Sequence, residues 1–195
     1  KYVHITNCKF NTGDDCIAIK SGRNGDGRRV NIPSENIVVE NCDMKDGHGG
    51  VVMGSEISAG VRNVFVRNCT MNSPNLDRAI RIKTNTLRGG FVENVYVKDI
   101  EVGQVKEAVL KINTYYGIYG KQEGEFIPTI QNINLENVTV ENGGKYGLLI
   151  QGREEKPVTG ISFKNVTIKN ADTPLKVEHC EPISYTNTTI NQKSY

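Results

Sequence analysis

The sequence predicts an all-β chain wound into a right-handed parallel β-helix, a solenoid of about seven coils that forms one domain over residues 1–195. Three observations lead to this fold. A short apolar phrase recurs along the chain, a second apolar run follows most of its copies, and signals for tight hairpins are scarce. Apolar side chains at every second position are typical of strands, and a unit that returns every 22–38 residues or so is typical of a solenoid.

The first strand of each coil carries the phrase apolar-x-apolar-x-Asn, in which Asp once replaces Asn. Its copies lie at 3–7, 37–41, 64–68, 95–99, 133–137, 161–165 and 183–187. In a parallel stack, identical Asn side chains one coil apart can hydrogen-bond as a ladder along the axis. Cys8, Cys42 and Cys69 each follow this Asn, and we expect them, like Cys16 and Cys180, to be small buried apolar side chains.

The second strand of a coil is a short apolar run that follows the first after a turn. Its copies lie at 16–20, 51–55, 79–83, 108–112, 146–150 and 174–178. The third copy reads Ala-Ile-Arg-Ile-Lys. Because successive side chains of a strand point to opposite faces, Ile80 and Ile82 are predicted to enter the core, while Arg81 and Lys83 share the outer face.

Composition and charge exclude several classes of function. Lys and Arg number 24 and Asp and Glu 22, without the long one-sign block that would indicate nucleic acid or a membrane surface as a partner. No apolar run reaches the roughly 18 residues of a membrane span. The five cysteines have no spacing suited to zinc, and we expect neither a metal nor a cofactor.

Two acids stand side by side in the first coil, in the turn sequence NTGDD that ends at Asp15. Like charges raise each other's proton affinity, so such a pair costs stability unless something uses it. A solvated turn is the alternative, since Asp favours turns. The matching turn of the second coil holds His48 between glycines, and the strand after the third turn holds Arg81 and Lys83. These groups then line one wall within about 10 Å, which predicts a cleft for an anionic substrate.

Taken singly, each of these groups is more simply a solvated surface residue, and their shared register favours function. In this order on a β-helix, NTGDDCIAIKSG, Gly47-His48-Gly49 and Arg81-Ile82-Lys83 resemble glycoside hydrolase family 28, the polygalacturonases and their relatives. The resemblance covers nearly the whole chain. It implies a secreted or periplasmic inverting hydrolase that cleaves α-1,4-linked galacturonic acid in pectin or its oligosaccharides, without a metal. Inverting glycosidases hold their two carboxyl groups about 6.5–9.5 Å apart.

The resemblance also implies a role for each group of the wall. Asp14 would be the general acid that protonates the leaving oxygen, and Asp15 would help to activate water. His48 would hydrogen-bond near the acid and tune its proton affinity. Arg81 and Lys83 would bind the galacturonate carboxylate.

Two further substrate-binding residues follow from the resemblance. The family places a tyrosine in the cleft about one coil beyond the Arg-Ile-Lys strand, and Tyr116, or less readily Tyr115, fits that position. The stretch Gly22–Pro33, read as a basic loop, is similar to that of exo-acting bacterial members. Within this loop Arg28, together with Arg23 and Arg29, would stand near the acids and clamp the carboxylate of a terminal sugar.

The chain departs from the family at its start. The family has a third aspartate, in an Asn-Thr-Asp phrase about one coil before the paired acids, and no such phrase precedes Asp14. The resemblance therefore implies the C-terminal part of such an enzyme, incomplete at its N-terminal end and impaired in hydrolysis. A first strand at 2–6 without a coil above it also predicts either self-association through that end or that the chain is part of a longer protein.

Two other functions stay open at this point. A non-catalytic carbohydrate-binding or adhesive β-helix, in which the charges only decorate the surface, is the main alternative. A pectate lyase is also a β-helix, but it would need clustered carboxylates for calcium, and no cluster is evident beyond Asp14 and Asp15. Whether the substrate is homogalacturonan, rhamnogalacturonan or a decorated relative, and whether cleavage is endo or exo, is left undecided by the sequence.

Overall fold

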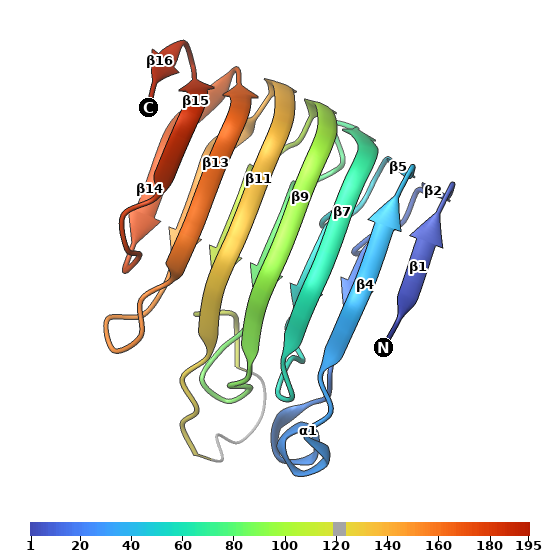
Figure 1. Ribbon diagram of the computed structural model, residues 1–195, viewed down its shortest axis with the longest axis vertical. Coiled ribbons are helices and arrows are strands. Elements are labelled where there is room, and N and C mark those ends of the chain that lie inside the picture. Colours follow the sequence, from blue (N-terminus) through green and yellow to red (C-terminus); the bar gives the residue numbers. More distant parts are fainter. Residues whose placement is uncertain (119–123) are drawn as a thin grey trace.

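The computed structural model describes residues 1–118 and 124–195, and these form a right-handed parallel β-helix (Figure 1). Two parallel sheets wind together around one apolar core. One sheet contains the copies of the first apolar phrase, and the other contains the copies of the second run. The predicted fold and its two sets of strands are confirmed.

The larger sheet has a strand from each coil, and Figure 1 shows these strands side by side from β1 to β15. They are β1 (Val3–Thr6), β4 (Ser34–Glu40), β7 (Val61–Asn72), β9 (Phe91–Gln104), β11 (Thr129–Asn142), β13 (Thr159–Ile168) and β15 (Ser184–Ile190), followed by the antiparallel β16 (Lys193–Ser194). Like residues lie in register, as Val64 beside Val95 and Val95 beside Ile133. Each coil therefore adds one layer to a continuous apolar stack.

The smaller sheet has six strands and carries the predicted wall of charges on its outer face. They are β3 (Ile17–Ile19), β6 (Val51–Gly54), β8 (Arg78–Lys83), β10 (Ala108–Asn113), β12 (Gly144–Gln151) and β14 (Ala171–Glu178). Ile82, Ile112 and Ile150 stack in register, and each is fully buried. The alternation predicted for β8 is confirmed, because Ile80 and Ile82 belong to the core cluster.

The Asn ladder is present, and it also bends the strands. Asn68 donates from Nδ2 to Asn41 Oδ1 at 2.6 Å, and both residues have positive φ, 49° and 55°. Asn tolerates this left-handed backbone better than most residues. Beyond the bend, β2 (Lys9–Phe10) and β5 (Asp43–Met44) pair with each other, and β5 pairs with the end of β7, forming a short third face. The Asn thus turns the chain around a corner while bonding the coils together.

A second Asn ladder runs where the strands of the larger sheet begin. Asn63 donates to Asn36 at 3.0 Å, Asn94 to Asn63 at 3.2 Å, and Asn132 to Asn94 at 2.6 Å. All four residues have positive φ. The sequence carries this signal, because an Asn also precedes four copies of the apolar phrase.

The stretch predicted as a basic loop contains a short helix, α1 (Asn24–Val30). Its seven residues are too few to show apolar periodicity, so the sequence pattern could not predict it. A Cβ added at Gly27 would lie 2.7 Å from the carbonyl carbon of Gly22, so the close contact of α1 with the coil requires glycine. Within the described residues, no helix is long and apolar enough to cross a membrane.

The cysteines differ in burial. Cys16, Cys42 and Cys69 are buried, as predicted, whereas Cys8 and Cys180 are only half-buried. All five are free thiols. Burial raises the pKa of Cys69 to about 11, as it does for Cys180. These thiols therefore behave as packing groups at neutral pH.

Candidate active site

A cavity of about 680 Å³ opens along the outer face of β3, β6 and β8. It is strongly polar. Its lining comprises Asp14, Asp15, Ala18, Lys20, Arg23, His48, Ser55, Glu56, Asp77, Arg78, Arg81, Lys83, Arg88 and Tyr116. The structure thus brings together six of the seven residues that the sequence predicts for the site. The seventh, Arg28, lies elsewhere.

The parallel stacking of three coils places the acids, the imidazole and the cations side by side. Cys16 donates its backbone N–H to Gly49 at 2.8 Å, and Gly50 donates to the carbonyl of Arg78 at 2.9 Å. The turn before β3, the turn before β6 and the start of β8 are therefore neighbours. Register brings these turns together, and the long side chains of Arg81 and Lys83 reach Asp15 from further along β8.

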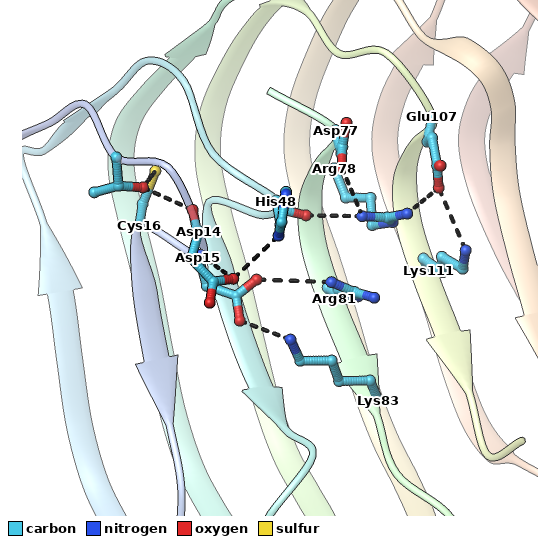
Figure 2. A network of polar contacts seen from close by, with 11 residues as sticks. Asp14, Asp15, Cys16, His48, Asp77, Arg78, Arg81, Lys83, Glu107 and Lys111 are labelled. Atoms are coloured by element: carbon cyan, nitrogen blue, oxygen red, sulfur yellow. Dashed lines mark hydrogen bonds and ion pairs between the residues drawn. The ribbon is translucent and has the colours of Figure 1, made fainter. Parts of the chain in front are cut away.

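Asp15 is buried and faces two cations of β8 (Figure 2). Lys83 Nζ lies 2.7 Å from Asp15 Oδ2, and Arg81 Nη1 lies 3.7 Å from Oδ1. The Asp15 side chain is only 5% exposed. Within the described part of the chain, Asp15 Oδ1 and Arg81 Nε are buried without a hydrogen-bond partner. Donor and acceptor capacity therefore remains at the floor of the cavity.

Asp14 stands at the rim, with 81% of its side chain exposed. Its Oδ1 accepts the backbone N–H of Asp15 at 2.8 Å and lies 3.1 Å from His48 Nδ1. The Asp15 N–H lowers the pKa of Asp14, slight burial opposes this, and the His48 hydrogen bond and the charge of Lys83 lower it further. Two adjacent carboxyls thus have different surroundings, one exposed beside an imidazole and one buried against cations.

A buried arginine that sequence reasoning missed lies behind His48. Arg78 Nη1 donates to the His48 carbonyl at 3.0 Å and lies 3.1 Å from Asp77 Oδ2, while its other terminal nitrogen pairs with Glu107 (Figure 2). Glu107 also lies 3.3 Å from Lys111 Nζ. Strand alternation would point Arg78 inward with Ile80. The sequence pattern could not show that Arg78, the first residue of β8, pairs with two carboxylates.

The structure distinguishes between the two candidate tyrosines. Tyr116 lines the cavity, with its ring centroid 5.5 Å from Lys83 Nζ and 5.7 Å from Arg81 Cζ. Tyr115 lies instead under the guanidinium of Arg153, at 4.2 Å. Tyr116 is therefore the one placed to contact a ligand held by the two cations.

Arg28 does not line the cavity, contrary to the position its predicted role needs. Its guanidinium lies 3.6 Å from the centroid of Phe126 and donates to the carbonyls of Leu87 and Arg88, at 2.9 and 3.3 Å. It therefore fastens α1 to two other segments. Of the three arginines predicted near the acids, Arg23 lines the cavity and Arg28 does not, because sequence order says nothing of where a helical side chain points.

A second group of charges, which we call the distal cluster, lines the same cavity where β3 and β6 end. It consists of Lys20, Arg23, Glu56 and Arg88. Lys20 Nζ lies 2.7 Å from one Glu56 oxygen, and Arg88 Nη2 lies 3.7 Å from the other. The distal cluster thus holds three cations and one carboxylate, which leaves this end of the cavity positively charged.

Both the sequence and the structure of this chain resemble those of known proteins. Residues 1–191 match the sequence model of the family described as glycosyl hydrolases family 28. A probable polygalacturonase of Vitis vinifera is 32% identical over 176 residues, which are 89% of this chain and 35% of that protein. The chain also resembles the crystal structure of a hyperthermoactive exopolygalacturonase from Thermotoga maritima, with a TM-score of 0.91 and 38% identity over 98% of this chain and 42% of that one.

A family 28 exopolygalacturonase of Yersinia enterocolitica shares the fold, with a TM-score of 0.76 and 22% identity over 95% of this chain and 34% of that one. The chain therefore spans well under half the length of these relatives. In the described residues, no group of three or more His, Cys, Asp or Glu side chains is arranged to hold a metal ion. Since the family match extends over nearly every coil of the β-helix that carries the paired acids, this chain belongs to glycosyl hydrolases family 28.

Proposed function

We propose that this chain carries the catalytic wall of a polygalacturonase-like glycosidase, which hydrolyses α-1,4-galacturonosyl linkages of pectin with inversion. One observation supports this most strongly. An exposed carboxyl bonded to an imidazole stands next to a buried carboxyl paired with two cations, and both face one polar cavity. The substrate is a polymer outside the cell, and we expect the protein to be secreted or periplasmic.

The proposed reaction uses the two carboxyls in different roles. Water attacks the anomeric carbon from one side of the sugar, and its proton passes to the carboxylate of Asp15. The glycosidic carbon–oxygen bond breaks on the other side, and the leaving oxygen takes the proton of Asp14. The products are two sugar chains, and a proton returned from Asp15 to Asp14 through solvent completes the cycle.

Asp14 must be protonated before this step, although in the free chain its pKa is lowered. A bound uronate would raise the proton affinity of Asp14 in two ways. It brings a negative charge into the cavity, and it displaces water from the exposed carboxyl. His48, as the neighbouring imidazole, would keep the carboxyl oriented toward the leaving oxygen.

The substrate carboxylate would bind to the cations of β8. Arg81 is 3.7 Å from Asp15, beyond hydrogen-bond distance, so its guanidinium can still donate to a ligand. Tyr116 lies beside the same two cations and would pack against the sugar ring. The distal cluster would take a second carboxylate, in place of the predicted clamp by Arg28.

The test is the release of reducing ends from polygalacturonate, with free and with fully methyl-esterified substrate. It should be made with this chain and with a version lengthened by two N-terminal coils, because the resemblance implies a further carboxylate there. We expect the free acid to be preferred at least tenfold, given that a charge-assisted hydrogen bond is worth about 1.5–3 kcal/mol. Binding of oligogalacturonate without release by either version would instead indicate a carbohydrate-binding β-helix.

A further inference from the structure

The turn that holds His48 has little intrinsic stiffness. His48 lies between Gly47 and Gly49, and Gly50 follows, so the backbone around the imidazole is unusually free in the unfolded chain. Contacts from outside the turn must fix it. His48 donates its own N–H to the carbonyl of Asp14 at 3.0 Å, which ties one side of the turn to the neighbouring coil.

Arg78 ties the other side. Its Nη1 donates to the His48 carbonyl at 3.0 Å, and the Arg78 carbonyl accepts the N–H of Gly50 at 2.9 Å. The backbone that carries the imidazole is therefore held between Asp14 on the preceding coil and Arg78 on the following one. The same imidazole then reaches Asp14 Oδ1 through Nδ1 at 3.1 Å.

Arg78 is itself held by acids on two coils. Its side chain is 8% exposed, and its partners are Asp77 on its own coil and Glu107 on the next, which Lys111 also contacts. Burial raises the pKa of Glu107, but the charges of Arg78 and Lys111 outweigh burial and hold this pKa lowered. A planar guanidinium can donate in three directions at once, whereas an ammonium is a single point of charge.

We propose that Arg78 is a positioning residue, which transmits the Asp77–Glu107 anchor to the His48 carbonyl and thereby aims the imidazole at Asp14. The inference rests on the proposed function, in which Asp14 is the acid. Arg78 and its two acidic partners lie behind His48 and belong to none of the sequence motifs. Lining the cavity, Arg78 could alternatively bind substrate directly, and the two roles predict different measurements.

The direct test follows His48 by proton NMR in the chain itself, without substrate. The chain has three histidines, so a His48→Asn spectrum assigns the His48 signal. Charged groups that line the cavity beside the Asp14–His48 pair are Asp15, from the turn of Asp14, Asp77, just before β8, and Arg78, Arg81 and Lys83 of β8. In Arg78→Gln, which leaves the other four in place, we expect the His48 signal to lose its response to the ionisation of Asp14.

Matched variants separate positioning from general damage. Arg62→Gln removes another arginine paired with a glutamate, Glu35 at 2.6 Å, on the larger sheet, and it should leave the His48 titration unchanged. Arg78→Lys should restore the response in part. Should Arg78→Gln fail to fold, Glu107→Gln keeps Arg78 in place and should weaken the response in the same direction.

Kinetics in the active, lengthened version distinguish positioning from substrate binding. For positioning, Arg78→Gln should lower kcat roughly 10- to 100-fold with KM changed less than about twofold. A His48 titration in folded Arg78→Gln that matches the unaltered chain would overturn the inference, as would a change confined to KM. Because the NMR test needs no turnover, it can succeed or fail independently of the proposed activity.

Discussion

Lys83 Nζ lies 2.7 Å from Asp15 Oδ2, so one cation both anchors the buried acid and faces the space where a uronate would bind. Removing one partner of a buried ion pair leaves the other charge uncompensated, which typically costs about 3–5 kcal/mol. Because Arg81 remains 3.7 Å from Asp15, we predict that Lys83→Met lowers the free energy of unfolding by an amount at the lower end of this range, measured by urea denaturation.

The matching control is a double-mutant cycle with Asp15→Asn. Because the two side chains are in contact, the double variant should be destabilised by clearly less than the sum of the single variants. Strict additivity would mean that the 2.7 Å contact does not contribute to stability.

The second prediction concerns pH and His48. The Asp15 N–H is the largest cause of the lowered pKa of Asp14, and the His48 hydrogen bond and charge add to it. His48→Asn should therefore raise the pKa of Asp14 part of the way toward its ordinary value. A general acid must be protonated, so the alkaline limb of kcat/KM should move to higher pH although the rate itself falls.

The sign for stability follows from the same shift. A carboxyl with a lowered folded-state pKa contributes stability above its unfolded pKa, and this contribution is lost as the pH falls through the folded value. Comparing urea unfolding at neutral and strongly acidic pH should show a smaller acid loss in His48→Asn than in the unaltered chain. An unchanged acid loss and an unmoved alkaline limb would remove His48 from this role.

The third prediction concerns the Asn ladder. Asn68 combines a 2.6 Å hydrogen bond to Asn41 with a left-handed backbone, φ 49°. Glycine adopts the left-handed backbone without strain, so Asn68→Gly loses only the side-chain hydrogen bond. This loss should lower the free energy of unfolding by about 1 kcal/mol. Asn68→Ala loses the amide and strains the backbone, for about 2–3 kcal/mol in total. Urea denaturation of the two variants measures the ladder and the bend separately, and equal losses would contradict the backbone contribution.

The fourth prediction concerns the distal cluster. Arg23 lines the cavity, whereas Arg29, on the same short segment, is exposed and pairs with Asp26 at 3.5 Å. Arg23→Gln should weaken the binding of digalacturonate about tenfold by calorimetry, through loss of one charge-assisted contact, and should leave galacturonate monomer binding nearly unchanged. Arg29→Gln is the matched control. If both variants bind digalacturonate equally well, the distal cluster holds no second carboxylate.

Much of the fold could be predicted because strand alternation and the repeated Asn are local signals that parallel stacking copies from coil to coil. Val64, Val95 and Ile133 occupy the same register for that reason. The third face could not be predicted, because β2 and β5 are two residues long and carry no alternation. The helix α1 could not be predicted either, since its seven residues contain one large apolar side chain, Val30, and so show no apolar period.

The front of the site could be predicted for the same reason as the strands. Asp14 and His48 lie at matching points of successive coils, and Lys83 lies further along the strand of the next coil, from which its long side chain reaches Asp15. The buried residues behind these groups could not be predicted. Arg78 is two residues before the core residue Ile80, so strand alternation predicts that it also points into the core. The structure shows instead that its guanidinium pairs with Asp77 and Glu107.

Arg28 illustrates the opposite error. Its charge and its position in a basic stretch suggested a ligand contact, but its guanidinium is used on Phe126 and two carbonyls. Arg88, outside that stretch, lines the cavity with its side chain only 5% exposed. The hydrogen bonds of Arg28 join residues 59 and 60 positions apart in the sequence, which no local pattern encodes.

The central claim is that Asp14 protonates the leaving oxygen in an inverting hydrolysis. The most direct measurement follows oligogalacturonate by proton NMR with the lengthened version and its Asp14→Asn variant, recording the anomer formed first and the rate. The account predicts that the β-anomer appears first and that Asp14→Asn slows turnover at least about 100-fold with the fold intact. The α-anomer as first product, or near-normal turnover of Asp14→Asn, would contradict it.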